Sequence, residues 1–323
     1  MSIDRAFCEF YDNIELGALP EGRIASAWPT LHAFLVDKYS VSAAAVFLQG
    51  SYANETTVKP ANPSSEYDLD VVVIGADDTN SPNDALEHLE RMLAEDGGYA
   101  KRLDPKKPCV RLHYADSETG RFHIDVVVAR ECATAPLEIP FRDEEWHDTN
   151  PEGYRDWCKA RGPRFTRTVR MLKRWRDENQ DERRGIKSIV LQVLVGSSLA
   201  EGSDAESLAG TLANIKMLLA AHPDTPPFIA NPSLPSENLA ERWSDSHYRN
   251  FLSELNAAVD LSGRALHATS DEDAHELWGE LLGEAFPSPP DEPARSAIPA
   301  PPAKSLYAPR IQVAPRERYG RGV

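Results

Sequence analysis

Residues 47–74 read FLQGSYANETTVKPANPSSEYDLDVVVI. The apolar run Ala43–Leu48 leads into this segment and is typical of a short buried strand, which the small pair Gly50-Ser51 ends. Such a pair lets backbone N–H groups turn toward an anion at the start of a short helix, so we interpret it as a phosphate cradle. By itself a Gly-Ser turn is a weak signal, and Ser51 could serve simply as a helix cap.

Two acids follow in the next apolar run. Asp68 and Asp70 lie two residues apart, so both project from one face of a predicted strand while Leu69 packs on the other face. Two carboxylates on one face repel each other unless a cation lies between them. Oxygen ligands beside a phosphate cradle are typical of a magnesium site that substrate phosphates complete. The alternative is a pair of acids on an edge strand that faces water.

A third acid stands in a second apolar run. Asp125 lies within FHIDVVV, residues 122–128, where a charge is costly unless it is paired or bound to metal. A third carboxylate would turn the magnesium site into a two-metal site. His123 precedes Asp125 by two residues and could share its face, although a strand histidine with an ordinary hydrogen-bond partner is the simpler interpretation.

These motifs resemble those of the polymerase-β-like nucleotidyltransferase superfamily. Within it, the chain is similar to the bacterial cGAS/DncV-like nucleotidyltransferases, which make cyclic oligonucleotide signals in antiphage defence. The resemblance covers residues 1–287 and includes later landmarks besides the acids and Gly50-Ser51. Those landmarks are WHDTNP at 146–151, MLKRW at 171–175, IKS at 186–188, and the segment 277–287.

The resemblance implies a fold and a reaction. The fold is α/β (α+β), with a polymerase-β-like core on a mixed sheet, a helical second lobe, and an active site in the cleft between them. The reaction condenses NTPs into a cyclic di- or oligonucleotide and releases pyrophosphate. Asp68, Asp70 and Asp125 would hold two Mg²⁺ ions, with Mn²⁺ as an alternative, and Asp125 would help the acceptor hydroxyl lose its proton. An effector that responds to the cyclic nucleotide is the implied partner.

A basic segment interrupts an otherwise acidic chain. Between Arg155 and Lys187 there are twelve Lys or Arg and five Asp or Glu, a balance of 12 − 5 = +7. The resemblance implies that Lys173, Ser188 and Lys187 bind the donor triphosphate. Two alternatives remain, a solvated helix face and an activator site for a polynucleotide.

Composition limits the classes of function. With 323 residues, the chain suits one large domain or two lobes with an ample core. Its hydrophobic content of 41% and charged content of 27% are ordinary for a soluble globular protein. The net charge of −16 argues against non-specific coating of nucleic acid, because that binding needs a cationic surface. Stable nucleic-acid binding is therefore not expected.

Cysteines and the N-terminus indicate the compartment. Four widely spaced cysteines, without a Cys-x-x-Cys pair, predict reduced thiols. The N-terminus lacks a basic region followed by an apolar core, and no run of about 18 apolar residues occurs. We expect a cytoplasmic protein without a membrane segment.

Apolar periodicity predicts the elements and three domains. Helices are expected over residues 3–17, 22–39, 85–93, 161–176, 187–200, 208–221, 237–266 and 271–284, and strands over 43–49, 67–75, 109–115 and 121–130. Residues 1–150 would form the nucleotidyltransferase core with two N-terminal helices bracing the sheet, and 133–151 an irregular crossing between lobes. Residues 151–286 would form the helical lobe. In residues 287–323, nine prolines among 37 residues predict a disordered or extended tail.

Rival functions follow from the same residues. A nucleotidyltransferase could modify another acceptor, such as tRNA, a small molecule or a protein. From a different class, a nucleotide-binding scaffold could have lost catalysis. The exposed tail could be joined to targets near Gly322 by a ubiquitin-transfer-like partner, although Val323 follows the glycine, or it could be a linker without a role.

Overall fold

The computed structural model describes residues 1–62, 65–76, 81–117, 120–133, 135–178 and 185–289. They form two compact units. A helical unit contains Met1–Leu16, Thr56–Asn62 and the described residues from 156 onward, and a sheet unit contains Gly17–Glu55 and the described residues of 63–155. Nearly all of the predicted tail lies outside the described residues.

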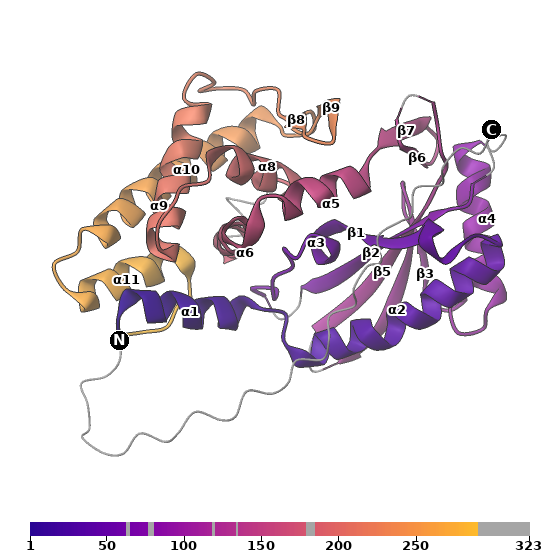
Figure 1. The fold of residues 1–323 in the computed structure, drawn as a ribbon, viewed down its shortest axis with the longest axis horizontal. Helices are drawn as coiled ribbons and strands as arrows, with labels where there is room; N and C mark the ends of the chain where they lie inside the picture. Colours follow the sequence, from indigo (N-terminus) through magenta and orange to yellow (C-terminus); the bar gives the residue numbers. More distant parts are fainter. Residues whose placement is uncertain (63–64, 77–80, 118–119, 134, 179–184, 290–323) are drawn as a thin grey trace, which may run out of the picture. The chain divides into compact units, whose positions relative to one another are not determined.

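The sheet unit is built on a five-stranded mixed sheet with the strand order β1-β2-β5-β4-β3 (Figure 1). Its strands are β1 (Val46–Gln49), β2 (Glu66–Ile74), β3 (Leu103–Pro105), β4 (Val110–Ser117) and β5 (Gly120–Ala129). β2 and β5 are parallel, and the other neighbours are antiparallel. The predicted α/β class and strands are confirmed, except that Ala43–Ala45 forms a 3₁₀ turn, since alanine has little preference for strands.

One face of this sheet is apolar and carries helix α2 (Ala18–Tyr39). Alternate residues of β2 and β5 on this face, such as Leu69 and Ile124, are fully buried. The Arg23 guanidinium of α2 lies over the rings of Tyr67 and Phe122, which project from the same face, so α2 covers it (Figure 1). Helix α4 (Pro82–Glu95) packs against β3, β4 and β5, and a capping box between Ser81 and Asp84 starts it.

The segment expected to be an irregular crossing contains a second, two-stranded sheet. β6 (Leu137–Pro140) pairs antiparallel with β7 (Trp146–Thr149), and a bridge between Arg130 and Glu138 joins this hairpin to the end of β5. The prediction of irregular structure over 133–151 is therefore wrong. The signal was weak because the two strands are only four residues long and interrupted by charged side chains.

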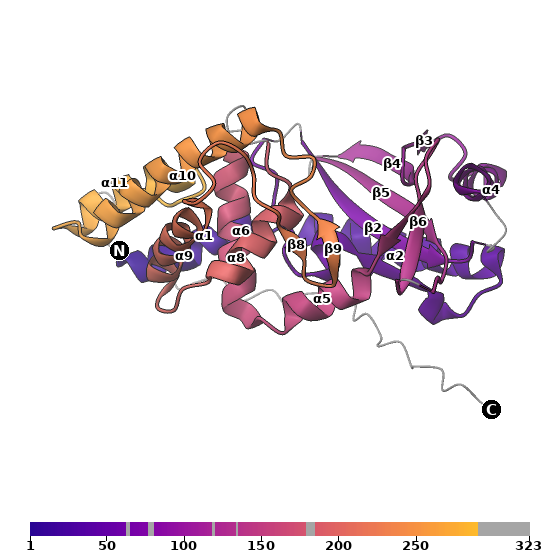
Figure 2. The same ribbon diagram turned by 90° about the horizontal axis from the view of Figure 1, so that it is seen from above.

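The helical unit contains α1, the part of α5 from Asp156 onward, α6, α8, α9, α10 and α11, together with a short hairpin. Their bounds are α1 (Ile3–Ile14), α5 (Pro151–Lys159), α6 (Gly162–Glu178), α8 (Ser188–Ser198), α9 (Asp204–Leu219), β8 (Ala230–Asn231), β9 (Leu234–Asn238), α10 (Asp245–Leu266) and α11 (Asp271–Leu282). Figure 2 shows α10 and α11 side by side, and many residue pairs connect them. The helix predicted from residue 237 begins instead at Asp245, because Ser244 caps it and β9 takes up the preceding residues.

The first helix packs differently from the prediction that it braces the sheet. α1 contacts α6, α9 and α11 and belongs to the helical unit. Its Phe7 ring lies edge-on to Trp278 at 4.9 Å and to Phe286 at 5.3 Å between ring centroids. The N-terminus therefore closes the core of the helical unit, and the predicted core boundary at residue 1 is corrected to Gly17. Among the described residues, no helix combines the length and apolar character needed to cross a membrane.

Replacing Phe7 by alanine is expected to lower the free energy of unfolding by about 3–5 kcal/mol, because Phe7 is fully buried and its ring contacts two aromatic neighbours. Urea unfolding followed by tryptophan fluorescence measures the change. Phe228→Ala is the matched control, since Phe228 is 63% exposed in the same unit. Equal losses for the two variants would contradict the assignment of α1 to this core.

Candidate active site

One row of residues crosses the sheet unit from β1 to β4. Gln49 lies opposite Asp70, Asp70 lies opposite Asp125, and Asp125 lies opposite Arg111. Residues directly opposite each other on neighbouring strands project from the same face of a sheet. Asp70 and Asp125 are therefore adjacent on one face, and Arg111 is the neighbour of Asp125 on its other side.

The third predicted ligand shares this face. Asp68 precedes Asp70 by two residues and lies opposite His123 in the next row. The register thus brings the three predicted acids to the face opposite the one that α2 covers. Their roles in catalysis and in metal binding stay predictions.

Gly50 adjoins Asp70 so closely that no side chain fits between them. Its φ is 68°, a conformation that favours glycine, and a Cβ built there would lie 1.9 Å from Oδ2 of Asp70. Gly50 begins the four-residue helix α3 (Gly50–Ala53), which also contains Ser51. The predicted cradle therefore stands directly against the predicted metal-ligating carboxylate, within one unit.

The same face becomes apolar beyond the acids. Phe47, Val72, Val127 and Cys109 form a buried cluster that Leu137 of β6 covers. Burial, and then the negative charge of Asp125, raise the pKa of the Cys109 thiol to about 12, so this thiol stays protonated at neutral pH. The acids lie where the buried cluster ends, which leaves Asp125 with a side chain 17% exposed.

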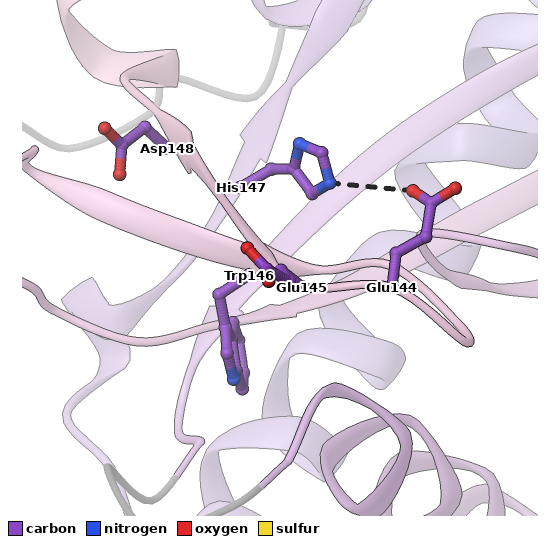
Figure 3. A pocket seen from close by; sticks show the side chains of 5 residues that line it. All are labelled: Glu144, Glu145, Trp146, His147 and Asp148. Atoms are coloured by element: carbon purple, nitrogen blue, oxygen red, sulfur yellow. Dashed lines mark ion pairs between the residues drawn. The ribbon is translucent and has the colours of Figure 1, made fainter.

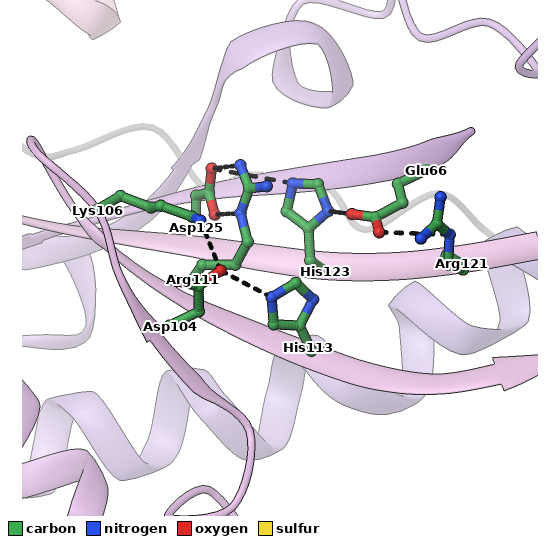
Figure 4. Close-up of polar contacts among 8 residues, drawn as sticks. All are labelled: Glu66, Asp104, Lys106, Arg111, His113, Arg121, His123 and Asp125. Carbon is green, nitrogen blue, oxygen red and sulfur yellow. Dashed lines mark hydrogen bonds and ion pairs between the residues drawn. The ribbon is translucent and has the colours of Figure 1, made fainter. Parts of the chain in front are cut away.

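Arg111 is the residue of this row that sequence reasoning missed. Its Nε donates to Oδ1 of Asp125 at 2.8 Å, and its Nη2 donates to Oδ2 at 2.9 Å (Figure 4). These hydrogen bonds raise the pKa of the Arg111 guanidinium. Arg111 sits in an alternating apolar and polar run, so its face could have been predicted, but its partner depends on the β4–β5 register.

Two other acids on this sheet also have cationic neighbours. Glu66 lies 2.7 Å from Nδ1 of His123 and 3.4 Å from Nε of Arg121 (Figure 4). Asp104 contacts Lys106 at 2.6 Å and His113 at 3.0 Å, and these hydrogen bonds lower the pKa of its carboxyl. His123 is buried, and its ring nitrogens lie 2.7 Å from Glu66 and 3.9 Å from Oδ2 of Asp125 without meeting the geometry of a hydrogen bond, so the simpler interpretation of this histidine stays a prediction.

The residues predicted to grip a triphosphate lie in the helical unit. Lys173 of α6 is buried and its Nζ donates to the backbone carbonyl of Thr56 at 2.9 Å. The hydroxyl of Ser188, the first residue of α8, accepts a hydrogen bond from Arg176 at 2.9 Å, and the exposed Lys187 precedes that helix. Their contact with a nucleotide, and the predicted cleft between lobes, stay predictions.

The face of the acids fits a divalent cation. Carboxylate oxygens are the ligands that Mg²⁺ and Mn²⁺ prefer, and Asp70 and Asp125 project side by side from adjacent strands. The Gly50 backbone lies directly against Asp70, and a Cβ there would overlap the carboxylate. A substrate phosphate can therefore come close to these oxygens.

A second group of possible metal ligands contains Cys132, Glu138 and Asp148, with ligand atoms within 4.8 Å of one another. Nε of Arg130 already donates to Glu138 at 2.9 Å. The Cys132 sulfur exchanges hydrogen bonds with the backbone of Ala135. Internal partners thus account for Glu138 and Cys132 without an ion.

A hollow of about 550 Å³ lies along the β6–β7 hairpin and is lined by Glu144–Asp148 (Figure 3). Nε2 of His147 lies 3.6 Å from Glu144. The hollow carries three carboxylates and none of the predicted site residues. Its negative charge disfavours the binding of a nucleoside triphosphate.

Comparisons with known sequences agree with the motifs. The family model described as the Second Messenger Oligonucleotide or Dinucleotide Synthetase domain (SMODS) matches residues 1–161. The c-di-GMP synthase of Roseivirga ehrenbergii is 29% identical over an alignment of 248 positions, which covers 65% of this chain and 65% of the relative, so this chain spans slightly less than two thirds of that relative's length. The cyclic AMP-AMP-AMP synthase of an Acinetobacter strain is 24% identical over 302 residues, covering 89% of this chain and 86% of the relative.

Solved structures share the fold. CdnC of Escherichia coli MS115-1, determined with ATP, is similar with a TM-score of 0.70 and 17% identity, covering 89% of this chain and 99% of that one. CdnG of Bradyrhizobium diazoefficiens, determined with GTP, gives a TM-score of 0.68 and 21% identity over 87% of this chain and 96% of that one. At these identities the likeness shows the fold alone, and it confirms the predicted fold class.

Gly50→Ala is expected to lower the free energy of unfolding by at least about 1–2 kcal/mol, because alanine is strained at positive φ and its Cβ would overlap Asp70. Gly22→Ala is the matched control, since Gly22 lies inside α2 with open space around its Cα. That change should raise the free energy by about 0.5–1 kcal/mol. Urea unfolding measures both, and a neutral Gly50→Ala would contradict the described turn.

Proposed function

Because the chain belongs to the bacterial cGAS/DncV-like nucleotidyltransferases, we propose that it condenses NTPs into a cyclic di- or oligonucleotide and releases pyrophosphate. The observation that carries the proposal is the row in which Asp70 lies opposite Asp125 while Gly50 packs against Asp70. It combines metal ligands with a place where phosphate can approach them. The two relatives whose names specify a cyclic product support the same class of product.

Family membership implies dependence on a divalent metal ion, and we propose two Mg²⁺ ions, with Mn²⁺ as an alternative. Asp68, Asp70 and Asp125 would hold them. When bound, the ions would stabilise negative charge on the attacking and leaving oxygens.

The chain's own residues would then do the remaining work. Backbone N–H groups after Gly50, with Ser51, would hold donor phosphates, and Lys173, Lys187 and Ser188 would contact the triphosphate. The Asp125 carboxylate would accept the proton of the acceptor hydroxyl, which makes that oxygen a better nucleophile. The linear intermediate would then bind again, and the same nucleotidyl transfer would join its two ends into a ring.

The biological role is part of the proposal. The cyclic product would act on an effector that responds to it, in a CBASS-type antiphage defence in the cytoplasm. A ubiquitin-transfer-like partner at the C-terminal tail is a further prediction, and Gly322 and Val323 lie outside the described residues. The acidic net charge of −16 supports small nucleotides, rather than a polynucleotide, as the bound species.

Incubation of the purified protein with the four NTPs and Mg²⁺ should give a cyclic nucleotide, identified by mass spectrometry, together with pyrophosphate. Asp70→Asn and Asp125→Asn should each lower pyrophosphate release at least about 100-fold. Even the loss of a residue that only hydrogen-bonds to a metal ligand costs about 10–100-fold in metal affinity or activity. Asp116→Asn is the matched control, because Asp116 is an exposed acid on β4, and it should retain wild-type activity.

Three results would contradict the proposal in different ways. Linear or macromolecule-linked nucleotide as the sole product would favour a transferase for another acceptor. Full activity of both asparagine variants would remove the proposed metal ligands. No turnover, combined with an unchanged defence phenotype for Asp68→Asn and Asp70→Asn, would favour a nucleotide-binding scaffold.

Removal of divalent ions with EDTA is expected to stop pyrophosphate release, because the carboxylates alone repel the triphosphate. Excess Mg²⁺ or Mn²⁺ should restore it, and Ca²⁺ should restore far less, since its longer and more flexible coordination fits the reacting geometry poorly. Turnover that persists in EDTA would rule out the metal-dependent mechanism.

A further inference from the structure

Arg111 belongs to the row of the acids, yet the proposed reaction assigns it no role. Its guanidinium binds both oxygens of Asp125, at 2.8 and 2.9 Å, in the parallel arrangement that arginine and carboxylate favour (Figure 4). The two side chains are 26% and 17% exposed, so solvent screens this pair less than a surface ion pair.

The side from which Arg111 approaches is set by the strand order. β5 lies between β2 and β4, so Arg111 reaches Asp125 from the β4 side while Asp70 lies on the β2 side. A carboxylate has about four lone-pair positions, and the arginine fork uses one on each oxygen. The remaining positions can serve a cation that Asp125 shares with Asp70.

The geometry points to Arg111 as a positioning residue that orients Asp125 for a divalent cation held between Asp125 and Asp70. This inference rests on the proposed function. Metal-ligating carboxylates are usually hydrogen-bonded by a partner outside the coordination shell, and that partner fixes their orientation. Without the fork, repulsion from Asp70 would turn the Asp125 carboxylate away from the site.

The alternative role for Arg111, competition with the metal ion, predicts the opposite change in metal affinity. If the positive charge of Arg111 only competed with the metal ion, its removal would tighten metal binding. If it orients Asp125, its removal weakens metal binding, and lysine, which keeps the charge but lacks the fork, does not restore it. The direction of change in metal affinity therefore decides between the two.

The test measures binding of Mn²⁺ alone to the full chain, from the EPR signal of free Mn²⁺, with no nucleotide present. Arg111→Met and Arg111→Lys should each raise the dissociation constant about 10–100-fold. Arg121→Met is the matched control, because Arg121 projects from the same face of the sheet beside Glu66, and it should bind like the wild type. Asp125→Asn identifies the site and should lose the binding.

Unchanged or tighter binding by Arg111→Met overturns the inference, and so does full restoration by lysine. Thermal unfolding without metal shows whether each variant is folded, and the lysine variant keeps the test decisive if the methionine variant is not. In turnover, both variants should raise the Mg²⁺ concentration for half-maximal rate more than the KM for NTP. A wild type that binds Mn²⁺ through Asp125 but forms no product would defeat the proposed function and leave the role of Arg111 standing.

Discussion

The parallel register between β2 and β5 is the constraint on which the candidate site depends. It sets Asp70 opposite Asp125, and because side chains alternate along a strand, a slip of one residue by either strand would turn the carboxylate of that strand into the apolar face under α2. Burying unpaired carboxylates costs far more than any strand pairing gains. The fully buried Leu69 and Ile124 hold the register from the other face, so the core positions the acids without touching them.

The acids gain their properties from lying at a border. On one side, Phe47, Val72 and Val127 are buried in one cluster with Cys109. Burial is the main cause of the raised pKa that keeps the Cys109 thiol protonated at neutral pH. On the other side, the face carries Asp68, His123 and Glu66. An ion between carboxylates at such a border is partly desolvated, which strengthens its attraction to them, and water can still reach the site to exchange with it.

The sequence predicted those parts of the fold and site that depend on local pattern. The strands, most helices and the spacing of Asp68 and Asp70 follow from periodicity, and Gly50 follows from the turn after an apolar run. The pairing of Asp125 with Arg111 was missed, because a register between two strands is a property of the packed sheet and no short motif encodes it. Tertiary contacts also outweighed weak local preferences elsewhere. They explain why neither the β6–β7 hairpin nor the place of α1 in the helical unit could be predicted.

The ends of the row from Gln49 to Arg111 differ in charge, and this difference determines where positive charge can be added. Its β1 end carries the neutral Gln49 and the bare backbone of Gly50, whereas its β4 end already carries the Arg111 guanidinium. A cation that approached from the β4 end would meet that guanidinium and be repelled, while one between Asp70 and Asp125 would be attracted by both carboxylates. Strand order, more than the number of acids, therefore favours the position beside the glycine turn for the proposed ion, where the proposed triphosphate would meet it.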